Sequence, residues 1–241
     1  MIFTPTRFLV AATVILASAA PAQQKPSNLD TVLHQLDVAS ANFKSAQANF
    51  RWDVYQRVVR ETTSQCGVIY FERHGDATEM GAKVAPTATQ SCSGEAAATA
   101  NGTRTLAYKS GELQMFEPGT NHLTILHAGN NQAQYESFLT LGFGGSGRDL
   151  AKAWTITDQG TETINGTPTE KLDLVSKDDS VRNMFTHVTI WIDAVRGLSL
   201  KQQFFAPNGD TRTATYSNIK LNASINKKPY DISKSDQRIQ H

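Results

Sequence analysis

The fold is decided by residues 154–175, WTITDQGTETINGTPTEKLDLV, in which strand-like runs flank the pair Asn165-Gly166. Trp154–Asp158 and Gly160–Ile164 precede this pair, and Thr167–Val175 follows it. Two-residue hairpin turns favour Asn-Gly, because both positions need a positive φ. The stretch therefore predicts antiparallel strands joined by tight turns.

The same rhythm of short strands and turn residues continues in both directions along the chain. Further strands are predicted at Phe50–Val58, Gly67–Arg73, Thr78–Val84, Thr103–Lys109, Glu112–Glu117, Asn121–His127, Phe185–Asp193, Leu198–Phe205 and Thr211–Leu221. Strands and helices do not alternate, as they would in a parallel sheet. The sequence thus predicts a mainly β protein with a single, strongly curved antiparallel sheet of about ten strands.

One amphipathic helix is expected before the strands, from about Leu29 to Ala46. Pro26-Ser27-Asn28 is typical of a helix start. Apolar residues then recur at helical spacing, at Leu29, Val32, Leu33, Leu36 and Phe43. A helix of this length can cover part of a sheet.

A second interruption of the strands, residues 132–152, is expected to be helical or lid-like. Its centre, GFGGSG at 142–147, matches the dinucleotide motif G-x-G-x-x-G, but that motif needs a parallel βαβ unit and hairpins follow here. We expect instead a loop that leads to a helix capped by Ser146 or Asp149. Since glycine gives the backbone freedom, the candidate lid or hinge residues are Leu141, Gly142, Gly144, Gly145 and Gly147.

The first 22 residues have the order of a secretory signal peptide. Arg7 is followed by the apolar, uncharged run Phe8–Ala19 and then by Ala20-Pro21-Ala22. As a helix this run would be about 18 Å long, too short for a hydrocarbon core of about 30 Å, which disfavours a retained membrane anchor. We therefore expect a cleaved signal peptide over 1–22 and one exported, soluble domain over 23–241.

Charge and composition exclude several classes of protein. The 241 residues include 23 basic and 22 acidic ones, and Arg7 is the only charge within the signal peptide. The mature chain is thus balanced, whereas nucleic-acid binders normally carry a basic excess, so no nucleic-acid partner is expected. With 39% hydrophobic and 19% charged residues, the chain is neither disordered nor a multi-span membrane protein.

No group of residues has the spacing of a catalytic or metal site. The six histidines are scattered, and none pairs at metal-ligand spacing. Ser146 lies in GGSGR, which lacks the last glycine of the nucleophile motif G-x-S-x-G. We expect no metal, no cofactor and no enzyme activity.

Cys66 and Cys92 are the only cysteines, and both belong to the exported part. Export to an oxidising compartment favours a disulfide between them, which would stabilise the fold by about 3–4 kcal/mol. A hairpin that turns at Gly75-Asp76 would place Cys66 opposite Val84. The segment after Pro86 must therefore fold back for the bridge to form.

Alternation along the predicted strands gives the sheet one apolar and one polar face. The apolar positions are Phe50, Trp52, Val54, Ile69, Phe71, Leu106, Tyr108, Leu172, Leu174, Val188, Ile190, Ile192, Leu198, Leu200 and Phe204. One helix and one lid cannot cover so broad a concave face. The face is either packed shut or lines a cavity for an apolar guest, and we expect the cavity.

The leading helix is followed by GVIYFERHG at 67–75 and then, after a turn, by GELQMFEP at 111–118. These two runs resemble G-x-L-x-F-x-R-P-G and D-G-x-x-x-W-x-Y-x-P, the motifs of the LolA family of periplasmic lipoprotein carriers. The lid segment at 138–154 and the later runs KLDL (171–174), IWID (190–193), YSNI (216–219) and YDI (230–232) also fit. The likeness covers essentially the whole mature chain.

The resemblance implies an incomplete antiparallel β-barrel whose hydrophobic cavity is capped by helices and takes the acyl chains of lipoproteins. It also implies a periplasmic location, an inner-membrane lipoprotein-releasing complex as donor and an outer-membrane acceptor. A monomer is expected. In the family, an arginine at the end of the second strand hydrogen-bonds to the lid and helps to gate the cavity, and its counterpart here is Arg73.

The alternation supports this position for Arg73 independently. Ile69, Phe71 and Arg73 share one strand face, which places the guanidinium at the rim of an apolar concavity. Carbonyls at a helix end or in the loop Leu141–Ser146 are the expected acceptors.

A lipid- or lipoprotein-sensing protein of the envelope-stress response on the same scaffold is the alternative function. Such sensors usually append a second domain, and the chain ends soon after the last strand, which favours the carrier.

Overall fold

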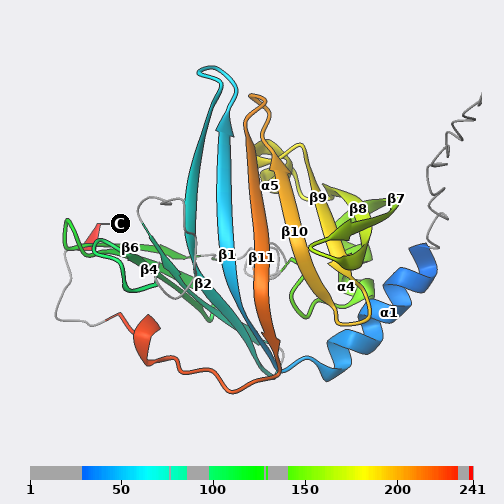
Figure 1. Cartoon of the computed structure of the whole chain (residues 1–241), viewed down its shortest axis with the longest axis horizontal. Helices are drawn as coiled ribbons and strands as arrows, with labels where there is room; N and C mark the ends of the chain where they lie inside the picture. Colours follow the sequence, from blue (N-terminus) through cyan, green and yellow to red (C-terminus); the bar gives the residue numbers. More distant parts are fainter. Residues whose placement is uncertain are drawn as a thin grey trace, which may run out of the picture.

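The computed structural model describes residues 29–75, 77–85, 98–127, 129, 141–232 and 239–240. The expected signal peptide, Cys92 and the part of the lid segment before Leu141 lie outside these residues. The described chain forms one strongly curved sheet, with the α-helices gathered toward one end of it (Figure 1).

The sheet is antiparallel throughout its long strands. It consists of β1 (Ser45–Gln56), β2 (Glu61–His74), β3 (Ala77–Val84), β4 (Arg104–Lys109), β5 (Glu112–Glu117), β6 (His122–His127), β7 (Trp154–Ile164), β8 (Thr167–Ser176), β9 (His187–Asp193), β10 (Leu198–Phe205), β11 (Thr211–Leu221) and the short β12 (Ile239–Gln240). The spatial order is β12-β6-β5-β4-β3-β2-β1-β11-β10-β9-β8-β7, and only β12 pairs in parallel, with β6. Since β7 and β12 do not pair with each other, the described strands form an incomplete barrel, as predicted.

Strand β1 joins the two arms of this sheet, because it pairs with β2 on one edge and with β11 on the other. Asn222, just after β11, fixes the chain where it enters β1. Its side-chain oxygen accepts hydrogen bonds from the backbone N–H groups of Lys44 (2.8 Å) and Ser45 (3.2 Å), and its side-chain nitrogen donates to the carbonyl of Asn42 (3.0 Å). The first helix, the first strand and the last long strand therefore meet at one point.

The helices are α1 (Leu29–Asn42), α4 (Gly147–Ala153), α5 (Asp179–Met184) and the 3₁₀ turn η2 (Lys228–Tyr230). Helix α1 ends before the predicted Ala46, because Ser45 and Ala46 already pair within β1. Ser146 caps α4 by accepting a hydrogen bond from the Asp149 N–H (3.0 Å), as predicted. None of the described helices has the length and apolar character needed to cross a bilayer.

Several strand bounds differ from the prediction. β5, β10 and β11 have the predicted ends, but β1 and β2 form a longer hairpin whose turn holds Val58, which is 90% exposed and not part of a strand. The two short strands predicted around Gly160 are one strand, β7, with a register shift between Asp158 and Thr161. Helix α5 was not predicted and precedes β9.

The concave side of the sheet contains two hydrophobic clusters. The barrel cluster lies on β1–β4 and the adjoining strands and consists of Phe43, Ala46, Ala48, Phe50, Ile69, Phe71, Met80, Ala82, Val84, Tyr108, Phe143, Leu198, Ala214 and Tyr216. The helix cluster lies between the helices and β7–β9 and consists of Val32, Leu36, Leu141, Trp154, Leu172, Leu174, Val181, Phe185, Val188, Ile190, Ile192 and Ala194.

Candidate functional site

The lid loop, defined here as residues 141–146, bridges the two clusters. Leu141 packs in the helix cluster and Phe143 packs in the barrel cluster. Phe143 forms an isolated antiparallel bridge with Leu198, for which the Ser199 N–H donates to the Gly142 carbonyl at 2.7 Å. The loop is thereby fastened to the start of β10.

Arg73 binds the lid loop and the end of α1 at the same time. Its guanidinium donates to the carbonyl of Ser40 (2.6 Å) and to the carbonyl of Gly144. The Ser40 hydroxyl donates to the same Gly144 carbonyl at 2.7 Å, and the guanidinium lies over the Phe43 ring. Both acceptors are of the expected kinds, a helix end and the loop. A charged hydrogen bond contributes about 1.5–3 kcal/mol, so this contact can hold the loop without making it permanent.

A second polar contact holds the other end of the loop. The side-chain amide of Gln202, on β10, donates to the Leu141 carbonyl, and its oxygen accepts a hydrogen bond from the Tyr216 hydroxyl at 3.1 Å. Gln202 and Tyr216 are both buried, and burial raises the pKa of the Tyr216 hydroxyl above its ordinary value. Neither residue was predicted to belong to the site. The available signal was that Gln202 takes a position of the strand alternation that Leu200 and Phe204 fill with apolar side chains.

Phe143 fills the space between the loop and the sheet. It is 2% exposed and stacks on Phe71 with ring centroids 4.4 Å apart. The edge of its ring faces Tyr216 at 4.8 Å. Phe143 was not predicted either, because the glycines around it indicate a loop and give no sign that its ring is buried.

The lid glycines are required for close packing. A Cβ atom on Gly144 would lie 2.3 Å from the Phe43 ring, and one on Gly147 would lie 2.1 Å from the Leu33 carbonyl oxygen. Gly142 and Gly144 also have positive φ, of 76° and 77°. Gly145 alone of these has neither a positive φ nor a neighbour within 4 Å of such a Cβ. The predicted role of these glycines as a hinge stays a prediction.

A cavity of about 720 Å³ lies beside the loop, within the size range of small-molecule sites. Its apolar lining residues are Leu36, Leu141, Phe143, Trp154, Val181, Ile190 and Ile192, and its charged ones are Arg73, Asp149, Lys152, Lys177 and Asp178. The indole N–H of Trp154 is buried without a hydrogen-bond partner, which costs about 1–3 kcal/mol. The cavity thus offers both the apolar and the charged groups that an amphiphile can contact.

The predicted lining residues are distributed unequally around this site. The cavity is lined by Ile190. The residues buried in the two clusters or beside them are Phe50, Ile69, Phe71, Tyr108, Leu172, Leu174 and Leu200. The half-buried ones are Val54, Leu106 and Phe204. Trp52 is 37% exposed and packs against Phe50 at 5.3 Å. Most of the apolar face is therefore packed within the two clusters, against Phe143 in one and against the helices in the other.

Cys66 is buried in β2 and is disulfide-bonded. Its carbonyl accepts a hydrogen bond from the Ala85 N–H (2.9 Å), and Gly67 pairs with Val84, so the hairpin has the expected register within about one residue. Cys92 lies outside the described residues. The pairing of Cys66 with Cys92 stays a prediction.

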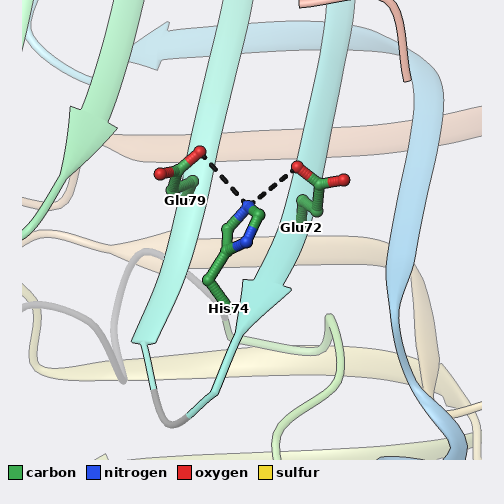
Figure 2. Close-up of side chains that lie close together, drawn as sticks. All are labelled: Glu72, His74 and Glu79. Carbon is green, nitrogen blue, oxygen red and sulfur yellow. Dashed lines mark hydrogen bonds and ion pairs between the residues drawn. The ribbon is translucent and has the colours of Figure 1, made fainter. Parts of the chain in front are cut away.

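A compact group of charges lies at the turn between β2 and β3 (Figure 2). The His74 ring nitrogen Nε2 lies 2.9 Å from a Glu72 oxygen and 3.4 Å from a Glu79 oxygen. These three side chains could hold a metal ion. However, the ammonium of Lys227 contacts both carboxylates and lies 3.1 Å from His74 Nε2, so a cation already occupies that position.

This ionic cluster of Glu72, His74, Glu79, Lys109 and Lys227 ties the C-terminal segment to the sheet. Burial opposes ionisation of Glu72 and Glu79, but hydrogen bonds from Lys227, with His74 or Lys109, outweigh it and lower the pKa of both carboxyl groups. Burial likewise acts to lower the pKa of Lys227, but its bonds to the two carboxylates raise it. Glu72, Glu79 and Lys227 are therefore charged over the whole neutral range, and the cluster acts as a structural fastening.

No protein-family model and no curated protein matches the chain. Solved structures resemble it over most of its length. A protein from Thermus thermophilus, described as uncharacterized and conserved, is 12% identical with a TM-score of 0.51, and the match covers 88% of this chain and 97% of that one. This similarity shows a shared fold and does not extend to activity.

Two further solved structures match at lower scores. A LolA superfamily protein from Nitrosomonas europaea is 14% identical, with a TM-score of 0.38 and coverage of 86% of this chain and 98% of that one. The MucA/MucB complex of Pseudomonas aeruginosa matches at 14% identity and a TM-score of 0.47, over 87% of this chain and 62% of that one. The chain has the architecture that was predicted for it, an open antiparallel barrel with an N-terminal helix.

Proposed function

We propose that this protein is a periplasmic carrier that shields the acyl chains of lipoproteins, or of related lipids, on their way to the outer membrane. The observation that carries the proposal is the closure of an apolar concave face by a loop that Arg73 holds through hydrogen bonds. Such a loop can open while the sheet stays folded, because it belongs to none of the long strands and only Leu141 and Phe143 anchor it in the two clusters. A carrier needs this property, since its cargo must enter and leave.

The cavity beside the loop supports the same function. Its apolar lining residues suit hydrocarbon, and its charged ones suit the polar end of an amphiphile. We propose a soluble monomer that receives its cargo from an inner-membrane lipoprotein-releasing complex and passes it to an outer-membrane acceptor.

The deciding experiment is mass spectrometry of lipids and lipopeptides that co-purify with the exported protein, together with titration of a fluorescent fatty acid. We expect bound acyl species and saturable uptake. Phe71→Glu should abolish uptake and leave the fold largely intact, because it places a carboxylate on the face that takes the acyl chain. Unfolding of Phe71→Glu, seen by circular dichroism, would mean that Phe71 belongs to a closed core and would count against the cavity. Val175→Glu, on a partly exposed side chain of β8, is the matched control and should bind normally. A wild-type protein that is free of lipid and takes up no probe would refute the proposal.

Transfer distinguishes carriage from sensing. The loaded protein is mixed with acceptor vesicles, and the movement of labelled lipopeptide is followed over time. A carrier releases its cargo to an acceptor. Tight uptake without release would favour the alternative, a lipid- or lipoprotein-sensing protein.

A further inference from the structure

Phe143 differs from every other aromatic member of the barrel cluster in where it comes from. Phe50, Phe71, Tyr108 and Tyr216 belong to strands of the sheet, and Phe43 follows α1 directly, whereas Phe143 comes from the lid loop. Its ring is nevertheless among the most deeply buried side chains of the described residues. A single loop side chain thus completes a core that the sheet leaves incomplete.

The backbone around Phe143 is shaped to insert this ring. Positive φ at Gly142 and Gly144 bends the chain on both sides of it. A Cβ on Gly142 would lie 2.4 Å from the Ser199 Cβ, and one on Gly144 would meet the Phe43 ring, so only glycine lets the loop approach this closely. The loop therefore presents one apolar group, Phe143, to the barrel cluster.

The same ring also forms part of the wall of the neighbouring cavity. Phe143 lines that cavity together with Leu141, Ile190 and Ile192. If the loop lifts, the space that the ring leaves between Phe71 and Tyr216 becomes continuous with the cavity. The cavity would then extend into the barrel cluster, which is apolar.

We propose that the slot between Phe71 and Tyr216 is a subsite for the distal part of an acyl chain, and that Phe143 is its resident occupant in the unloaded protein. This inference rests on the proposed carrier function. Cargo and lid loop then compete for one place: an acyl chain that enters the slot expels Phe143, and the returning ring expels the chain. The contacts of Phe143 set the affinity, and those of Arg73 and Gln202 guide the loop back.

The test compares Phe143→Ala with the wild type over fatty acids of increasing chain length. Short chains that end in the cavity should bind both proteins equally. Chains long enough to reach the slot should bind Phe143→Ala about tenfold or more tightly, because they no longer have to expel a buried aromatic ring. Phe185→Ala makes the same truncation in the helix cluster and is the matched control; it should show no such dependence on chain length.

Hydrogen exchange provides a readout that does not depend on the variant. The amides of Ser199 and Gly144 are bonded to Gly142 and Gly197 in the closed loop. Saturating the wild type with a long-chain fatty acid should accelerate exchange at both amides, whereas a short-chain acid should not. The proposed subsite would be overturned if the exchange of these two amides did not change when the long-chain fatty acid binds. It would also be overturned if Phe143→Ala and Phe185→Ala gained the same affinity for fatty acids of every chain length. Neither result would affect the carrier function, which instead fails if the wild type binds no acyl chain at all.

Discussion

The barrel cluster and the helix cluster lie on one concave face but are closed in different ways. The helix cluster is covered by α1, α4 and α5, and its members Leu172, Leu174, Val188 and Ile190 are fully buried. The barrel cluster is covered by a loop that contributes one ring and is held by Arg73 and Gln202. Under the proposed function, the barrel cluster is the half that opens when the loop lifts, whereas the helix cluster, whose residues form most of the apolar lining of the cavity, stays covered by its helices.

The largest effect on stability is expected in the helix cluster. Leu174→Ala should lower the free energy of unfolding by about 2–5 kcal/mol, since it leaves a cavity among rigid neighbours. Binding of a fluorescent fatty acid should stay unchanged as long as the protein is folded. Urea unfolding and probe titration measure the two quantities. A clear gain in probe affinity would show that the two halves are not separate.

The next effect concerns the fastening of the loop. Arg73→Leu keeps an apolar stem but removes the hydrogen bonds to Ser40 and Gly144, which contribute about 1.5–3 kcal/mol to closure. We expect about tenfold or more tighter cargo binding and slow release to acceptor vesicles. Arg73→Lys keeps the charge but loses the planar fork of hydrogen-bond donors. Its cargo affinity and release rate should therefore lie between those of the wild type and those of Arg73→Leu. Release at the wild-type rate from Arg73→Leu would exclude a gating role.

A smaller effect is expected from the lid glycines, which form a matched pair. Gly144→Ala introduces a Cβ at positive φ against the Phe43 ring and should destabilise the closed loop by about 1–2 kcal/mol. Gly145→Ala meets no neighbour and should be close to neutral. Hydrogen exchange at the Ser199 amide reports closure in both variants. If the Ser199 amide exchanged at the same rate in Gly144→Ala and Gly145→Ala, close packing of Gly144 would not be needed to keep the loop closed.

The smallest effect lies outside the concave face, in the ionic cluster. Because the pKa values of Glu72 and Glu79 are lowered, their contribution is complete above about pH 5 and is lost as the pH falls through the lowered values. Because the pKa of Lys227 is raised, its contribution is complete below about pH 10 and is lost as the pH rises further. Lys227→Met should cost about 0.2–1 kcal/mol within this window, and a stability profile against pH measures it.

The sequence predicts what depends on local pattern and misses what depends on long-range placement. Asn165-Gly166 and the alternation on each side predicted the β7–β8 hairpin, and both residues have the expected positive φ. Alternation also placed Arg73 at the rim. Helix α5 is too short to show a helical period, and nothing local distinguishes Phe143 from any loop phenylalanine. Its partners Phe71 and Tyr216 are far away in sequence, so only the folded sheet brings them together.

Pairing of β1 with β11 has a consequence for how this chain folds. Ala46 is opposite Leu221, so the central ladder of the sheet closes only when nearly the whole chain is available. Chains emerge from their N-terminus during synthesis, which leaves one edge of β1 unpaired until the last long strand arrives. Topologies of such high contact order fold in milliseconds to seconds rather than microseconds. The newly made protein is therefore exposed to edge-to-edge aggregation for longer than a helical protein of its size, and its refolding yield should fall as protein concentration rises.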